Sequence, residues 1–345
     1  MLADQTRERL NDPELVRIRD EHMRRLQTIF DGVDKEDTAF VLAGVDGGGA
    51  FIPWQGDPLS FYHDKLNALA EHADALRNTR IFRPMAMTTN LYGVHFSDAT
   101  FGAKVILHEG QWQSMLLTNR VGELPPPDLT RNTTWHLAQQ VAEIYRDAQL
   151  SVPFYGVPGI ASVLNVGINL YGAELLVAML TDPEDARHDL AIINATLMDM
   201  HRRQQYLLPA AQMQQGCPGD RIQPPGFAQI CGCSTQLLSR ELYRDFIAPL
   251  DTALLAAYPH GGLIHLCGGH TQHIPTWRGI PAFRAFQLND RAAGDLAHYF
   301  HGLRDDQILY VNPCEEMPLE RIMEITGGHR VVIVANLEMP PKKKF

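Results

Sequence analysis

The residues of this chain that are best suited to chemistry are one histidine and two cysteines. His265 and Cys267 stand two positions apart at the end of the apolar run GLIHLC, and Cys314 ends the later run ILYVNPC. Because alternate residues of a strand point to the same face, His265 and Cys267 can converge on one point. One imidazole and two thiolates suit zinc, and three protein ligands leave a position open for a reactant. The sequence therefore predicts a catalytic zinc site formed by His265, Cys267 and Cys314.

Two kinds of chemistry are open to such a site. Zinc with thiolate ligands can bind an incoming thiol, favour its deprotonation and hold the thiolate as a nucleophile. It can also polarise a carbonyl or phosphoryl oxygen. A single buried cysteine is more typical of a core than of a metal site. The prediction therefore depends on the agreement of three compatible residues, each at the end of an apolar run.

Cys231 and Cys233, in the segment QICGCST, form a second pair that shares one face at a strand end. The pair is compatible with redox chemistry, with an additional metal site or with the lining of a pocket. Pocket lining or simple packing is the interpretation we favour, so both cysteines are expected at the substrate pocket.

Further polar residues follow the apolar runs and are expected to contact substrate. Asn289, Asp290 and Asn336 come directly after such runs, and His270 follows the metal motif closely. Asp290 is also well placed to cap the next helix. Glu174 is a possible acid, base or fourth ligand, although a glutamate in the first turn of a helix needs no functional explanation.

The elements that must position these residues alternate regularly along the chain. Six short apolar runs are expected to be buried parallel strands: VPFYGV, GFAQIC, GLIHLC, FRAFQL, QILYVN and RVVIVA. Helical patterns separate them, over 133–148, 172–205, 238–258, 292–304 and 316–326. An open doubly wound sheet would also fit, but no Gly-x-Gly-x-x-Gly follows a first strand. We therefore predict a (β/α)8 TIM barrel, a fold whose functional residues gather where strands end.

The N-terminal part is expected to carry an addition to this barrel. Residues 13–31 show apolar positions at helical spacing with Pro13 at the start, so 1–35 is predicted to be an N-terminal helical extension. Residues 103–118 look like a hairpin that turns near Glu109 and Gly110. No long linker divides the chain, and 1–345 is predicted to be a single domain.

Composition limits the partners. The 345 residues carry a net charge of −10, so no basic field attracts nucleic acid or an anionic membrane. The N-terminus is charged and lacks the apolar core of a signal peptide, and no stretch approaches the ~20 apolar residues of a membrane span. Five cysteines, an odd number, speak against a disulfide framework. A cytoplasmic protein with free thiols is expected.

Several segments between 153 and 338 resemble the uroporphyrinogen decarboxylase superfamily, and more closely its zinc methyltransferase branch. These segments are GINLYGAELLVAMLTDPEDARHDL, LLSRELYRDFIAPL, LIHLCGGHTQHIP and QILYVNPCEEMPLERIMEITGG. That branch moves methyl groups between a corrinoid and a thiol such as coenzyme M, and its hallmark is His-x-Cys followed much later by Cys. His265, Cys267 and Cys314 match this hallmark.

The resemblance implies a (β/α)8 barrel in which zinc activates a thiol, whose thiolate takes the methyl group of a methylcorrinoid and leaves a cobalt(I) corrinoid. It also implies that the reaction can run in reverse, from a methylated small molecule. The chain has no corrinoid-binding Asp-x-His-x-x-Gly segment. The methylcorrinoid co-substrate is therefore expected as free cobalamin or on a partner corrinoid protein.

The chain also departs from its relatives. The Arg-Gln-Ala-Gly-Arg segment of the decarboxylases is absent, and Ile230-Cys231-Gly232-Cys233 stands where relatives often show Asp-Asp or Asp-Trp before glycine. Two alternatives to methyl transfer stay open at this point. One is a uroporphyrinogen decarboxylase-like lyase that acts on a carboxylated pyrrolic or aromatic substrate. The other is a purely structural metal site in a corrinoid-binding or scaffold protein.

Overall fold

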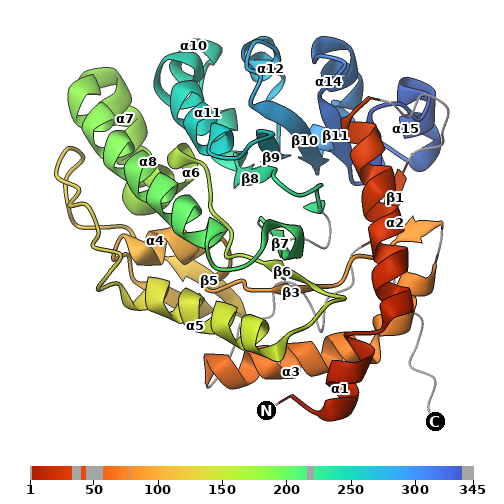
Figure 1. Cartoon of the computed structure of the whole chain (residues 1–345). Coiled ribbons are helices and arrows are strands. Elements are labelled where there is room, and N and C mark those ends of the chain that lie inside the picture. Colours follow the sequence, from red (N-terminus) through yellow and green to blue (C-terminus); the bar gives the residue numbers. More distant parts are fainter. Residues whose placement is uncertain (1, 33–39, 44–56, 79, 216–220, 336–345) are drawn as a thin grey trace.

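Parallel strands surrounded by helices form the body of the protein, as the computed structural model in Figure 1 shows. The structure describes residues 2–32, 40–43, 57–78, 80–215 and 221–335. Seven strands form one parallel sheet in the order β2-β1-β12-β11-β10-β9-β8, and a second parallel sheet has the order β3-β6-β7. The predicted parallel α/β architecture is confirmed. All six apolar runs contain strands of these sheets.

The strands are β1 (Phe40–Leu42), β2 (Ile81–Phe82), β3 (Ala86–Thr88), β6 (Phe154–Gly156), β7 (Met213–Gln214), β8 (Ala228–Cys231), β9 (Gly262–Cys267), β10 (Phe283–Asn289), β11 (Ile308–Val311) and β12 (Val331–Val334). The helices are α1 (Asp4–Arg9), α2 (Pro13–Phe30), α3 (Pro58–Glu71), α4 (Phe96–Thr100), α5 (Thr133–Ala148), α6 (Val163–Tyr171), α7 (Ala173–Thr181), α8 (Pro183–Gln205), α10 (Arg240–Leu242), α11 (Ala248–Ala256), α12 (Ile274–Arg278), α13 (Arg291–Gly294), α14 (Leu296–Gly302) and α15 (Leu319–Thr326). The short pair β4 (Val105–His108) and β5 (Gln111–Ser114) forms the predicted hairpin, which turns at Glu109 and Gly110 with positive φ.

Alternation along the strands divides the core into two layers. In β9, Ile264 and Leu266 belong to the large apolar cluster that also contains helix residues, whereas Leu263 belongs to a second, smaller cluster. Strands of both sheets supply this second cluster with Phe40, Leu42, Phe82, Ala86, Phe154, Leu263, Ala285, Ile308, Tyr310, Val332 and Val334. We call it the inner cluster. Leu26 and Phe30 of α2 pack into it as well.

The two sheets thus share one interior, as a barrel requires. An isolated parallel bridge between Ala161 and Cys231 links the segment after β6 to β8. Among the described strands, however, hydrogen bonding does not run continuously from one sheet into the other. The closed (β/α)8 ring, the single domain and the extension over 1–35 therefore remain predictions.

Four of the predicted helical patterns differ from the helices in the structure. The pattern over 238–258 contains α10, a π-helical segment and α11, and the pattern over 292–304 contains α13 and α14. The pattern over 172–205 contains two helices, α7 and α8, because Pro183 has no N–H to continue α7 and instead begins α8. The pattern over 316–326 becomes helical only after Pro318. By contrast, the bounds predicted for α5 agree with the structure, and α2 ends one residue before the predicted limit.

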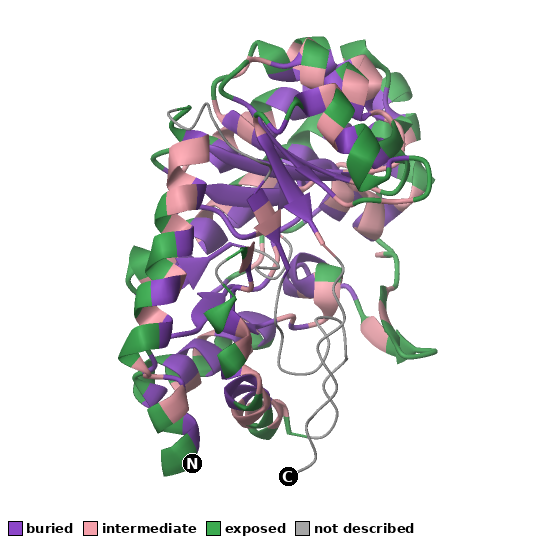
Figure 2. Cartoon of the chain, turned by 90° about the vertical axis from the view of Figure 1, so that its right-hand side faces the viewer, coloured by how far each residue is buried: buried purple, intermediate pink, exposed green. Residues whose placement is uncertain are grey.

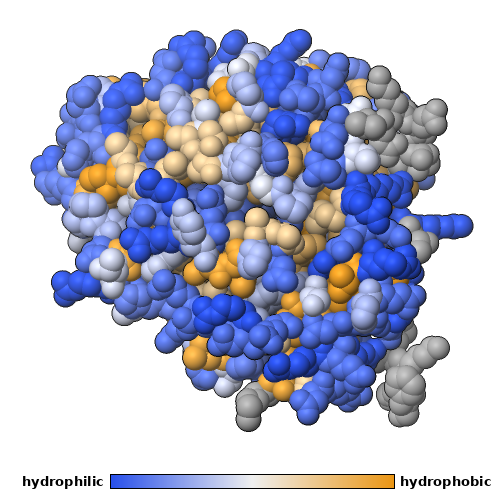
Figure 3. Space-filling model, viewed as in Figure 1, coloured by the Kyte–Doolittle hydropathy of each residue, from blue (hydrophilic) through white to orange (hydrophobic). Residues whose placement is uncertain are grey.

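Burial follows the layers: the strands of the two parallel sheets are almost entirely buried, and the helices expose their outer faces (Figure 2). Apolar groups nevertheless reach the surface over α7 (Figure 3), a helix whose Val177 and Leu180 are exposed. No single helix in the described ranges is both long and apolar enough to cross a membrane. Helices α6 and α7 pass that test only as a pair, and they are bent by 108°.

One buried carboxyl group makes stability depend on pH. Asp251 of α11 is fully buried, and it accepts a hydrogen bond from the Tyr243 hydroxyl at 3.3 Å. Burial raises the pKa of this carboxyl to about 7. An unfolded chain releases the same proton near pH 3.9. Between about pH 4 and pH 7 the unfolded chain has released this proton, whereas the folded protein still binds it. The free energy of unfolding therefore decreases as the pH rises through this range.

We expect Asp251→Asn to remove this dependence. The stability of the variant relative to the native protein should increase between pH 4 and pH 7.5, by roughly 4 kcal/mol at most. Urea unfolding at both pH values measures the change, and the comparison cancels groups common to the two proteins. A difference that stays constant with pH would contradict the assignment.

Candidate metal centre

The polar ends of neighbouring strands create the site. Strands β8 and β9 pair in parallel with Cys231 opposite His265, and the Gly232 N–H extends this pairing to the His265 carbonyl at 2.9 Å. Two residues further along, Cys233 follows β8 and Cys267 ends β9. His265 and Cys267 continue the row of β9 that begins with the inner-cluster residue Leu263, because alternate side chains share a face. This row is apolar at its start and polar at its end.

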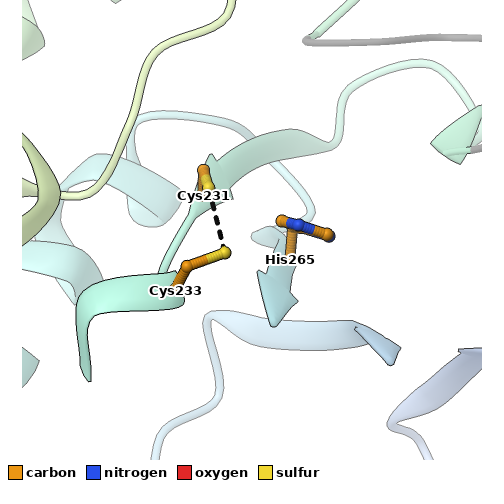
Figure 4. A group of neighbouring side chains, drawn as sticks. All are labelled: Cys231, Cys233 and His265. Carbon is orange, nitrogen blue, oxygen red and sulfur yellow. Dashed lines mark hydrogen bonds between the residues drawn. The ribbon is translucent and has the colours of Figure 1, made fainter. Parts of the chain in front are cut away.

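The sulfur atoms of three cysteines lie together. Cys231 Sγ is 3.5 Å from Cys233 Sγ, and Cys233 Sγ is 2.7 Å from Cys267 Sγ. The ligand atoms of Cys231, Cys233 and His265 all lie within 4.8 Å of one another, and Figure 4 shows these side chains gathered around one point. All three cysteines are free thiols and half-buried. Sulfur and imidazole nitrogen at such spacing are a donor set that fits zinc.

His265 is prepared to act as a neutral ligand. Its Nδ1 is hydrogen bonded to Gln287 Oε1, whose amide nitrogen donates to Asn312 Oδ1 at 2.8 Å. The amide oxygen can only accept, so Nδ1 carries the proton and Nε2 keeps its lone pair for a metal. Burial lowers the pKa of His265 to about 3, so the imidazole is neutral near pH 7. This is the form that metal binding requires.

The thiols influence one another. The hydrogen bond with Cys233 lowers the pKa of Cys231 to about 6 and also lowers the pKa of Cys267. The same contacts raise the pKa of Cys233. The proton is therefore held most tightly at Cys233, which lies between the other two thiols. A cation bound there would compete with this proton.

The cluster opens into a cavity of about 410 Å³. Its lining includes loops that follow β3 and β6, the first turns of α6, and the ends of β8, β9 and β10. The lining residues are Asn90, Gly93, Val94, Gly159, Ile160, Ala161, Asn165, Asn169, Arg221, Gln229, Cys231, Cys233, His265 and Asn289. Amide groups outnumber charged groups in this set, so the cavity suits a small organic molecule with several polar atoms.

Several residues of the cavity were not predicted from the sequence. The Asn165 amide donates to Cys231 Sγ at 3.5 Å and accepts the Ser234 N–H at 2.9 Å, which fixes the Cys-x-Cys segment. With the Gln229 amide turned so that both of its ends find partners, its oxygen accepts a hydrogen bond from Arg221 Nη1 at 2.9 Å. The role of Gln287 beside the site could have been suspected from the sequence, because it is a polar residue in the apolar run FRAFQL. The role of Asn165 could not, since it depends on contact with a segment 66 residues away.

Of the three predicted zinc ligands, the structure places His265 and Cys267 in or beside the cluster. Cys314 lies on the loop after β11, where its thiol contacts Glu316 Oε2 at 3.7 Å, and it is not one of the clustered ligand atoms in the described residues. Its role as a ligand stays a prediction. Cys231 and Cys233 line the cavity, and they also belong to the group of side chains that could hold a metal ion.

The other candidates are placed differently. Asn289 lines the cavity, whereas Asp290 is exposed at the start of α13 with φ of 48°. Asp290 occupies the N-cap position of α13, as expected, but its side chain accepts no capping hydrogen bond. His270 is fully buried, with hydrogen bonds at 2.9 Å to Thr235 Oγ1 and to the Cys267 carbonyl. It therefore supports the loop that carries Cys267.

Two candidates lie elsewhere. Glu174 is exposed in the first turn of α7 and lines a surface groove together with Leu116 and Asp185, while the cavity beside His265 is lined by other residues. Asn336 lies outside the described residues. Glu174 adds no group to the cluster.

Gln287→Leu tests the support of His265. The leucine removes the acceptor that holds the Nδ1 proton, so the ring loses its fixed orientation and tautomer. We expect metal affinity to fall by about 10–100-fold, the usual effect of removing such a partner. Competition with a colorimetric chelator measures the affinity. Gln287→Glu keeps an acceptor oxygen and should retain a higher metal affinity than Gln287→Leu. Equal affinities of both variants and the native protein would rule out the role of Gln287 in orienting His265.

The chain is similar to a known protein in its fold and not in its sequence. No protein-family model and no curated protein sequence matches the chain. Among solved structures, the chain is similar to a methyltransferase from Methanosarcina mazei, with a TM-score of 0.62 over 91% of this chain and 92% of the other. The two sequences are 14% identical in this comparison. At that identity the similarity establishes a common fold.

Proposed function

We propose that this protein is a zinc-dependent methyltransferase that moves a methyl group between a corrinoid and a thiol. The observation that carries the proposal is the group of imidazole and thiol ligands at the strand ends, opening into a cavity large enough for a small organic substrate. The similarity in fold to a methyltransferase supports it, as does the match of His265, Cys267 and Cys314 to the hallmark of zinc methyltransferases.

The residues divide into two roles. His265 and the neighbouring thiols would hold zinc, and a bound zinc supplies a site where an acceptor thiol is a thiolate at neutral pH. Gln287 fixes the tautomer of His265, and Asn165 fixes the Cys231 segment. Amides such as Asn169 and Asn289 line the remaining wall and would orient the polar part of the acceptor. As the new S–CH3 bond forms, the cobalt–carbon bond breaks and its electron pair stays on cobalt.

Free cobalamin or a corrinoid protein would be the partner, and a small thiol or a methylated small molecule the second substrate. The test combines metal analysis of the purified protein with a methylcobalamin assay. We expect about one zinc per chain and a thiol-dependent change in the visible spectrum of methylcobalamin. A native protein without metal would end the zinc proposal. Zinc with no activity toward several thiols would exclude methyl transfer between these substrates.

The alternative lyase needs no metal at the cluster. Full activity on a carboxylated pyrrolic or aromatic substrate after Cys267→Ser would therefore favour the lyase over methyl transfer. A saturated metal that exchanges no ligand with added thiols would instead support a structural site.

A further inference from the structure

We infer that a second cavity, at the end of the large sheet opposite the metal cluster, binds a small organic phosphate. The inference goes beyond the proposed function, because neither zinc nor methyl transfer enters it. The position, the charge and the apolar wall of this cavity carry it.

The cavity lies between α2 and the beginnings of strands in the large sheet, and its volume is about 560 Å³. Phe40 and Val331, which line it, are the first residues of β1 and β12. The metal cluster lies where β8 and β9 end, so the two sites are at opposite ends of a parallel sheet. Figure 1 shows α2 (red) against the C-terminal elements (blue) that supply most of the lining. Cavities of this volume hold small organic molecules.

The charge of the lining is opposite to that of the chain. Arg25, Arg278 and Arg330 line the cavity, and Asp305 is the only acidic residue among the described residues of its wall. With the two histidines of the wall neutral, these groups have a formal charge of +2, although the whole chain carries −10. A phosphate ester carries a charge of about −1.5 to −2 near pH 7. A phosphate group therefore balances the wall, whereas a single carboxylate would leave half of its charge uncompensated.

Two of the three arginines are available to a ligand. The guanidinium groups of Arg25 and Arg278 form no ion pair or hydrogen bond within the described part of the chain. Arg25 is half-buried, and its guanidinium lies over the Phe40 ring, 5.5 Å from the ring centroid. Such a contact orients the planar group and leaves its N–H donors unused. Arg278 is exposed at the end of α12.

The third arginine is fixed in place. Arg330 donates to the carbonyl oxygen atoms of Phe300 and Arg304, and its guanidinium lies 4.5 Å from the centroid of the Phe300 ring. These bonds use two of its five N–H groups, so three remain. A guanidinium that is already oriented loses little conformational entropy when it binds the oxygen atoms of a phosphate.

The apolar side chains of the wall indicate an organic ligand. Ile29, Phe40, Phe300, Leu303 and Val331 line the same cavity as the arginines. An inorganic phosphate would leave these groups uncovered. A phosphate ester with a small apolar or aromatic group would bury them, which contributes about 25 cal/mol per Å² of apolar surface.

Calorimetric titration of the chelator-treated protein tests the ligand class. The probes are phenyl phosphate, inorganic phosphate and phenol. We expect phenyl phosphate to bind at least ~10-fold more tightly than either of the other two, because only it offers both the anion and the ring. Zinc-loaded protein should give the same dissociation constant, since the cavity and the metal cluster are at opposite ends of the sheet.

Substitution of the arginines locates the site. Arg25→Ala and Arg278→Ala should each weaken the binding of phenyl phosphate by about 10-fold, the scale of one lost hydrogen bond to a charged group. Arg24→Ala is the matched control, because Arg24 is the exposed neighbour of Arg25 on α2 and does not line the cavity. Circular dichroism checks the fold of each variant. Arg278 is exposed, so its replacement tests the site even if Arg25→Ala is destabilised.

Three results would overturn the inference. One is the absence of binding of phenyl phosphate up to about 10 mM, a weaker affinity than a formed site provides. The second is equal affinity for phenyl phosphate and inorganic phosphate. The third is a dissociation constant that changes in neither arginine variant, or that appears only in zinc-loaded protein. Each can occur in a protein with or without methyltransferase activity, so this inference and the proposed function fail separately.

Discussion

Replacing His265 by alanine is expected to leave the protein folded but without its metal and with methyl transfer nearly abolished. In the proposed site the imidazole supplies the nitrogen ligand, and its ring is buried and oriented by Gln287. A catalytic metal contributes several kcal/mol to stabilising a transition state. We therefore expect the thiol-dependent rate of methylcobalamin demethylation to fall by about 100–1,000-fold. Metal analysis of the same sample should show less than one tenth of the native content.

His136→Ala is the matched control for this experiment. His136 is an exposed residue of α5, outside the cavity and the metal cluster. Its replacement should change neither metal content nor rate. Far-ultraviolet circular dichroism of both variants checks the fold. If His265→Ala retains stoichiometric zinc and the native rate, the cluster is not the catalytic centre.

Removing the metal should expose the thiol cluster to oxidation. Cys233 and Cys267 have their sulfur atoms 2.7 Å apart, and both are half-buried and not fully enclosed. In chelator-treated protein, mild peroxide should join them in a disulfide: the two thiols lose two electrons and two protons, and the peroxide is reduced to water. We expect two of the chain's five thiols to become unreactive toward a thiol reagent. Zinc-loaded protein should resist the same treatment, because its sulfurs are engaged.

Peptide mapping identifies the bond, and Cys233→Ser serves as the control for it. The variant should form no disulfide that contains Cys267, unless Cys231 takes the place of Cys233, which the same map would reveal. A chelated, peroxide-treated native protein with all thiols intact would show that the cluster is less accessible than its geometry indicates.

The strands, and the polar residues at their ends, could be predicted from the sequence because both depend on local patterns. A run such as GLIHLC is buried on both faces wherever it lies, so it predicts a parallel strand without knowledge of its neighbours. The period of two also determines that His265 and Cys267 share a face. The end of α7 and the start of α8 also depend on a local feature, Pro183. The prediction of one helix over 172–205 was wrong because it passed over this proline.

The order of the strands, by contrast, could not be read from the sequence. His265 and Cys231 are neighbours because β8 pairs with β9, whereas Cys314 follows β11, a strand that β10 separates from β9. Which strands lie side by side depends on how helices and strands far apart in the chain pack together, and no local pattern encodes this. The sequence by itself determined that imidazole and thiol ligands end buried strands. Only the tertiary structure decided which thiols lie within reach of the imidazole, because a ligand must be close to the metal in space and not along the chain.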